Sequence, residues 1–180
     1  HNRCRRQRQM CIRDRRTSGS AFGEVLEEAQ KLGYAESDPS LDIDGIDAAH
    51  KLAILSSIAF GTELDFEGVH VEGIRSISAE DIAFADEIGF RIKLLGIAEK
   101  TREGIRQRVH PAMVPISAPI SAIEGVLNGV SIEGDFVGPV MLEGAGAGGG
   151  PTASAVVADL VDIACGRILP LLGISSNYLT

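Results

Sequence analysis

The order of hydrophobic and polar residues in this chain alternates between the period of a helix and the period of a strand. Apolar residues three or four apart predict helices over about residues 18–32, 45–60, 78–88 and 151–168. Alternating or continuous apolar runs predict strands over residues 65–73, 90–98, 104–114, 130–133 and 137–142. Residues 120–127 fit either a short helix or a strand. This mixture of elements predicts an α+β domain.

Local signals mark where several of these elements begin and end. Asp44 is a suitable N-cap for the helix over 45–60, because its side-chain oxygen can accept hydrogen bonds from the first turn. Gly61 is expected to end that helix, and Asn128-Gly129 is a turn signal. Ser78 and Asp81 resemble a capping box with aspartate in the place of glutamate. The predicted buried residues of the second and fourth helices are Ile46, Ala49, Leu52, Ala53 and Leu55, and Ala155, Val156, Leu160, Ile163 and Ala164.

Composition and charge separate an acidic body from a basic start. The chain has 180 residues, 44% of them hydrophobic, which suits one domain with a sizeable core. Its net charge is −8, although residues 1–16 contain seven arginines and one aspartate. These basic residues could contact the phosphates of a nucleic acid. However, residues 10–15 resemble the translation of a transposon-end sequencing adaptor. Residues 1–17 are therefore interpreted as a non-native or disordered tail, and no nucleic-acid partner is expected.

Hydropathy and cysteine content indicate in which cellular compartment the protein acts. The sequence contains no run of eighteen apolar residues, so we expect no membrane partner. Its cysteines, Cys4, Cys11 and Cys165, have the spacing of neither a disulfide framework nor a zinc site. We therefore expect no metal bound by this chain and a reducing, cytoplasmic location.

Residues 33–51 concentrate charged side chains, with five carboxylates and one lysine. Asp47 and Lys51 are four apart and so lie on one face of the predicted helix, where they could form an ordinary surface ion pair. A calcium loop is excluded, because placing Gly45 at its sixth position puts Lys51 at the twelfth, where a glutamate is needed. The remaining interpretation is chemical: a lysine that donates a proton beside carboxylates that bind an ammonium group.

A second segment with chemical content is the glycine-rich stretch over residues 143–150, between a predicted strand and the last predicted helix. Glycines before a helix expose N–H groups at the positive end of the helix dipole, which suits a pyrophosphate. Gly144, Gly146 and Gly149 even have the spacing of the dinucleotide fingerprint. The fingerprint also requires a following strand that ends in an acidic residue, so a flexible turn stays an equal alternative on these residues alone.

These residues resemble a known family. Ala29, Gly33-Tyr34-Ala35, Asp38-Pro39, Asp42-Ile43, Gly45, Asp47 and Lys51 stand in the order and spacing of the homoserine dehydrogenase signature. The resemblance covers the chain from Ala21 to about Leu169, through Arg108-Val109-His110-Pro111 and the glycine-rich segment followed by Thr152-Ala153. It implies an α+β (α/β) fold: a mixed β-sheet with helices packed on one face, the substrate-binding and dimerisation domain of a two-domain dehydrogenase.

The resemblance also implies an activity and a set of site residues. The reaction would interconvert L-homoserine and L-aspartate 4-semialdehyde with NADP or NAD, in the biosynthesis of threonine, methionine and isoleucine. Lys51 would donate the proton, Glu36 and Asp47 would bind the substrate, and Gly33 and Gly148 would contact the cofactor. A homodimer is expected from the family.

The resemblance further implies a division of the chain and a missing half. Residues 18–145 would form the catalytic domain, and residues 146–180 the glycine-rich loop and the helix that returns to the nucleotide-binding domain. The N-terminal half, with the Rossmann unit and an expected monovalent-cation site, would be absent, so the fragment itself is expected to be inactive. The alternative is a non-catalytic α+β dimerisation or interaction module. In that case Glu36, Asp47 and Lys51 would not converge on one site.

Overall fold

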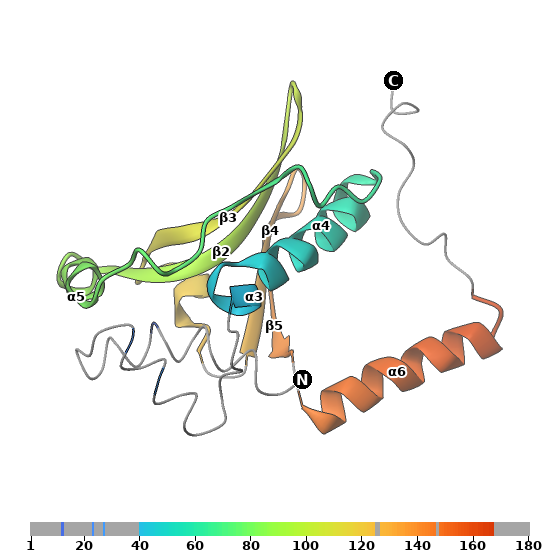
Figure 1. Cartoon of the computed structure of the whole chain (residues 1–180). Coiled ribbons are helices and arrows are strands. Elements are labelled where there is room, and N and C mark those ends of the chain that lie inside the picture. Colours follow the sequence, from blue (N-terminus) through green and yellow to red (C-terminus); the bar gives the residue numbers. More distant parts are fainter. Residues whose placement is uncertain are drawn as a thin grey trace.

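A computed structural model describes residues 40–124, 127–146 and 148–167, together with the single residues 12, 23 and 27. Over these residues the chain is an α+β structure (Figure 1). Its elements are α3 (Ser40–Ile43), α4 (Ile46–Phe60), β1 (Val69–Val71), α5 (Ala79–Glu87), β2 (Phe90–Thr101), β3 (Gly104–Pro115), the 3-10 helix η1 (Pro119–Ala122), β4 (Leu127–Gly134), β5 (Gly138–Ala145) and α6 (Gly149–Ala164). The predicted helix over 18–32 lies outside the described ranges.

The main sheet is mixed, with strand order β1-β3-β2. β2 and β3 form a long antiparallel hairpin whose register runs from Phe90 opposite Pro115 to Thr101 opposite Gly104. β1 pairs with β3 in parallel, with Val71 opposite Val109. β4 and β5 form a separate antiparallel hairpin. The strand predictions over 90–98 and 104–114 are therefore confirmed and each strand is longer than predicted.

Helices α4 and α5 both pack on one face of the β2–β3 hairpin. Successive strand residues point to opposite faces, so Ile92 and Leu94 share a face. Ile92 packs against α5 and Leu94 against the core of α4. Figure 1 shows the two helices over different parts of the long hairpin. The core under α4 consists of Ala49, Leu52, Ala53, Val69 and Val109.

Two boundary predictions are confirmed by backbone geometry. Gly61 ends α4 in the left-handed conformation, with φ 68° and ψ 32°, which glycine adopts without a steric penalty. Ser78 accepts a hydrogen bond from the Asp81 N–H over 3.0 Å, and the Asp81 carboxylate accepts one from the Ser78 N–H over 2.8 Å. This reciprocal pair is a complete capping box, so the shorter aspartate replaces glutamate.

Three predictions about individual residues were wrong. Asp44 does not cap α4, because Gly45 is the N-cap and the Asp44 carboxylate pairs with Arg75. Leu55 is 47% exposed, because the buried side of α4 continues through Ser56 and Ser57 instead. Asn128-Gly129 is not a turn: both residues lie within β4, where the partner strand β5 supplies a continuous ladder.

The predicted last helix exists, but its predicted buried side is exposed. α6 has no buried residue, and Val156, Leu160 and Ile163 are 53–66% exposed. In Figure 1 the helix extends away from the sheet. The apolar spacing correctly predicted the helix, whereas burial depends on a neighbouring surface, which the described part of the chain does not supply. None of the described helices is long and apolar enough to cross a bilayer.

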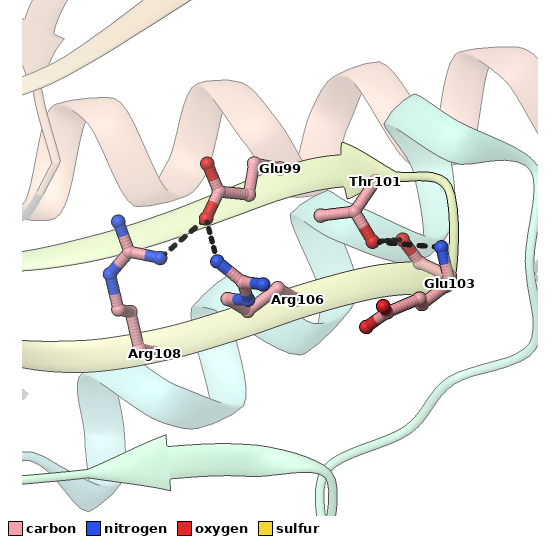
Figure 2. Close-up of polar contacts among 6 residues, drawn as sticks. Glu99, Thr101, Glu103, Arg106 and Arg108 are labelled. Atoms are coloured by element: carbon pink, nitrogen blue, oxygen red, sulfur yellow. Dashed lines mark hydrogen bonds and ion pairs between the residues drawn. The ribbon is translucent and has the colours of Figure 1, made fainter.

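The far end of the β2–β3 hairpin carries a small polar cluster, shown in Figure 2. Glu99 accepts hydrogen bonds from Arg108 over 2.6 Å and from Arg106 over 3.2 Å. The hydrogen bond and charge of Arg108, assisted by Arg106, hold the pKa of the Glu99 carboxyl below its usual range. At the turn, the Thr101 hydroxyl accepts from the Glu103 N–H. These contacts hold the hairpin's register at a solvent-exposed end.

Candidate active site on helix α4

The start of α4 is set by a glycine packed between two strands. Gly45 has φ 84° and ψ 7°, and its carbonyl accepts the first helical hydrogen bond, from Ala49. A β-carbon added at Gly45 would lie 3.2 Å from side-chain methyl groups of both Val71 and Val109. Both the left-handed backbone and the close packing therefore favour glycine. The helix begins against the sheet at this point, which also places the residues of its first turns.

Asp47 and Lys51 form an ion pair across one turn of α4. Their side chains keep 34% and 40% of their surface exposed, respectively. Asp47 lies in the first turn, where the helix dipole favours a carboxylate. The structure therefore brings together two of the three side chains expected to act on the substrate.

The pair lies on the side of α4 that faces away from the sheet. Each residue turns the helix by about 100°, so Asp47, Lys51, Ile54 and Ile58 follow one line along its surface. The buried residues Ala49, Leu52, Ala53 and Ser56 lie on the opposite side. Ile54 and Ile58 are 44% and 67% exposed. An open apolar surface therefore continues directly from the ion pair along the helix.

A close approach between α4 and β2 holds this orientation. Gly96 lies in β2 opposite Leu52, and a β-carbon there would stand 3.3 Å from a terminal methyl of Leu52. Because residue 96 has no side chain, the helix packs closely against the strand at this point. Burial of Leu52 on one side of α4 thereby turns the Asp47–Lys51 side outward.

The chemistry available to the pair follows from its two groups. An ammonium can donate a proton or a hydrogen bond to an oxygen that gains negative charge during a reaction. A carboxylate can accept hydrogen bonds from an ammonium of a bound molecule, in addition to orienting its own lysine. Both groups are partly exposed, so a small polar ligand can reach and bind them.

Gly148 is placed at the start of α6. It is the N-cap, with φ 122° and ψ 158°, a conformation that L side chains rarely adopt. The next two residues, Gly149 and Gly150, have open space where a β-carbon would stand, and Pro151 supplies no N–H. Exposed N–H groups at a helix N-terminus can hold a phosphate, so these residues fit the expected dinucleotide cofactor.

Two of the five expected site residues lie outside the described part of the chain. Gly33 and Glu36 fall outside the described residues, so their convergence with Lys51 stays a prediction. Figure 1 shows α6, which follows Gly148, standing apart from α4. Over the described residues, no group of three or more histidine, cysteine, aspartate or glutamate side chains is arranged to hold a metal ion.

Sequence reasoning missed Gly73 and Arg75, which contact the turn between α3 and α4. The Arg75 guanidinium is 2.5 Å from one carboxylate oxygen of Asp44 and 3.1 Å from the other. Thirty-one positions separate Arg75 from Asp44, so no helical or strand spacing relates them. Such a contact depends on the fold, and the sequence alone offers no signal for it.

Comparison with known proteins identifies the class and then the family. The family model described as homoserine dehydrogenase matches residues 10–161. Homoserine dehydrogenase of Neisseria gonorrhoeae is 52% identical over 153 residues, covering 85% of this chain and 35% of that protein. The crystal structure of a homoserine dehydrogenase from Thiobacillus denitrificans is 54% identical, with a TM-score of 0.83 over 87% of this chain and 36% of that one. A hyperthermophilic archaeal homoserine dehydrogenase in complex with NADPH is 31% identical, with a TM-score of 0.71, over 92% of this chain and 46% of that one.

These matches define the class as NAD(P)-dependent oxidoreductases. In the matched proteins this α+β domain is one part of a longer chain. The chain belongs to the homoserine dehydrogenase family. It spans about a third of the length of the curated relatives that it matches. The predicted α+β fold is confirmed by the similarity to solved structures of this family.

Proposed function

We propose that this chain is the substrate-binding part of an enzyme that interconverts L-homoserine and L-aspartate 4-semialdehyde. The observation that carries the proposal is the ion pair between Asp47 and Lys51 on the outward side of α4, in a chain of this family. Residues 18–145 would form the catalytic domain, and residues 146–180 would lead back to a nucleotide-binding domain.

The proposed role of Lys51 is general acid in the reduction of the aldehyde. When the carbonyl carbon accepts a hydride, its oxygen develops negative charge, and the Lys51 ammonium stabilises that charge and delivers a proton. In the direction of homoserine oxidation, the same amine accepts the hydroxyl proton. Asp47, one turn earlier, orients Lys51 and accepts a hydrogen bond from the ammonium of the substrate. Glu36 would share the binding of that ammonium.

NADP or NAD, when bound, supplies or accepts the hydride. Gly148 and the N–H groups that follow it at the start of α6 would contact its phosphate, and Gly33 would also contact the cofactor. The exposed line of Ile54 and Ile58 beside Lys51 suits a second domain that excludes water from the reaction. A monovalent-cation site would belong to that other part of the enzyme.

The proposal also covers the oligomeric state, the cellular compartment and the pathway of the enzyme. It would act as a homodimer in the cytoplasm, in the route to threonine, methionine and isoleucine. Most of the cofactor's contacts would come from a nucleotide-binding domain.

The test uses a full-length enzyme that contains this sequence, assayed by NADPH oxidation with L-aspartate 4-semialdehyde. Lys51→Ala should lower kcat by about 10²- to 10⁴-fold, the usual contribution of a general acid. Lys100→Ala, which removes an exposed lysine from the end of β2, is the matched control and should keep the wild-type rate. An undiminished rate in Lys51→Ala would contradict the proton-donor role.

A further inference from the structure

Three consecutive residues, Gly73, Ile74 and Arg75, contact the turn between α3 and α4. We call them the junction clamp. These residues follow β1, and Glu72 just before them donates its N–H to the Val109 carbonyl over 2.7 Å. The sheet therefore fixes the start of the clamp. Each of its three residues then contacts the α3–α4 turn in a different way.

The first contact is between backbones. A β-carbon added at Gly73 would lie 2.6 Å from the carbonyl oxygen of Ile43 and 2.7 Å from the α-carbon of Asp44. Real β-carbons do not approach other atoms so closely, and neither of these backbone atoms can move without moving the turn. Only glycine at residue 73 permits this approach.

The second contact is a backbone hydrogen bond over a buried pair. The Ile74 N–H donates to the Ile43 carbonyl over 3.0 Å. The side chains of Ile43 and Ile74 are both 0% exposed and pack together with Leu94 of β2. This contact joins the end of α3 to the sheet.

The third contact is ionic. Arg75 Nε lies 2.5 Å from Oδ1 of Asp44, and Arg75 Nη2 lies 3.1 Å from Oδ2. The same Nη2 donates to the Ser40 hydroxyl over 3.3 Å. A guanidinium that contacts both carboxylate oxygens fixes direction as well as distance. Asp44 is thereby directed toward Arg75 and away from the first turn of α4.

We propose that the junction clamp is a positioning element for Asp47 and Lys51, and that Gly73 and Arg75 act through it on the reaction. The proposal rests on the proposed function. Asp47 follows Asp44 by three residues, and Gly45 between them starts α4 against Val71 and Val109. A shift of the turn therefore becomes a shift or rotation at the first turn of α4. Misplacement of a catalytic group by about 1 Å can cost about 10²-fold in rate.

The experiment uses the full-length enzyme and measures kcat and KM for L-homoserine, KM for the cofactor, and the thermal unfolding midpoint. Gly73→Ala should lower kcat by about ten- to a hundredfold, because its β-carbon displaces the turn. Arg75→Ala should lower kcat by about three- to tenfold, and Arg75→Lys should restore part of that loss. KM for the cofactor should not change in any of these variants.

Two matched controls separate positioning from general effects of the substitutions. Gly68→Ala also creates a short contact, but only with the exposed side chain of Asp65, which can move aside. Arg102→Ala removes an exposed arginine from the turn between β2 and β3. Both should keep kcat within about twofold of the wild type.

A double-mutant cycle gives a result that a merely structural role would not produce. Because the clamp is proposed to position Asp47 together with Lys51, Arg75→Ala should lower kcat less in an Asp47→Asn background than in the wild type. Additive losses would overturn the proposal, as would folded variants of Gly73 and Arg75 with wild-type kcat. If Gly73→Ala does not fold, the Arg75 variants and the cycle decide the question alone. A wild-type enzyme that does not oxidise homoserine would overturn the proposed function, and this proposal with it.

Discussion

Lys51 forms an ion pair with Asp47 on the side of α4 directly opposite the residues that bury the helix against the sheet. One face of the helix thus supplies stability, and the other carries the pair that we propose acts on the substrate. Because the pair is half-exposed, its contribution to folding is small, on the order of 0–1 kcal/mol. Substitutions at the pair should therefore affect activity far more than stability.

Asp47→Asn in the full-length enzyme tests the division of roles within the pair. Loss of the carboxylate charge removes the partner of the substrate ammonium and loosens Lys51. We expect KM for L-homoserine to rise and kcat to fall, with kcat/KM lower by about a hundredfold or more. Steady-state kinetics with varied homoserine measures both constants. Glu87→Gln, at the exposed end of α5, is the control. Unchanged kcat/KM in Asp47→Asn would remove Asp47 from the substrate site.

Gly96→Val tests the packing that holds α4 on the sheet. The first added carbon would stand 3.3 Å from Leu52, and two further methyl groups would crowd the same space. Overpacking of this kind should destabilise the chain by about 1–3 kcal/mol. Urea unfolding of this chain gives the free energy directly. Gly144→Val is the matched control, since open space surrounds its β-carbon and it also lies in a strand. Equal effects at the two glycines would contradict close packing at residue 96.

The capping box of α5 predicts a dependence of stability on pH. The backbone hydrogen bond from Ser78, then the bond to its hydroxyl, lowers the pKa of the Asp81 carboxyl. A lowered pKa in the folded state means that the charged form is favoured on folding. The resulting stability is present above the ordinary aspartate pKa and is lost as the pH falls through the lowered value.

Asp81→Asn should therefore be less stable than the wild type at neutral pH, and the difference should shrink in acid. Unfolding midpoints across the pH range measure this difference. Ser78→Ala should cost about 1 kcal/mol at neutral pH, the usual value of an N-cap. A difference between wild type and Asp81→Asn that stays constant into strong acid would show that the carboxylate charge does not matter to the cap.

Leu160→Asp tests the proposed return of residues 146–180 to another domain. Leu160 is 59% exposed in α6 of this chain, so the substitution should change its unfolding free energy by no more than about 0.5 kcal/mol. In the full-length enzyme the same substitution should cost about 2 kcal/mol or more, because a buried carboxylate would lack a partner. Asp159→Asn, on the same helix, is the control. Equal small effects in both proteins would contradict the docking of α6.

Several features were predictable because they depend on neighbours in sequence. Ser78 and Asp81 are three residues apart, and the capping box needs only that spacing and the start of a helix. Gly61 ends α4 for a reason internal to its own backbone. The i, i+4 relation of Asp47 and Lys51 likewise follows once a helix forms. Family resemblance then assigned a meaning to that pair which spacing alone left open.

Other features depend on residues that meet only after folding. The pairing of Asp44 with Arg75 bridges thirty-one positions and replaced the local cap that was predicted. Asn128-Gly129 is a common turn sequence, but a full ladder with β5 outweighs that preference. The burial of Leu55 and of the apolar residues of α6 was predicted from periodicity, which identifies a helix face and not its partner.

Short-range rules were therefore enough to predict the longer helices and strands of the described chain, the end of α4, the start of α5, and the shared helical face of the candidate acid and its carboxylate. These follow from backbone geometry and hydrogen bonds within a few residues. The folded arrangement alone decided that this face points away from the sheet, and that Gly73 and Arg75 hold the turn before it. Both outcomes depend on close approach between distant segments, which packing determines and sequence spacing does not encode.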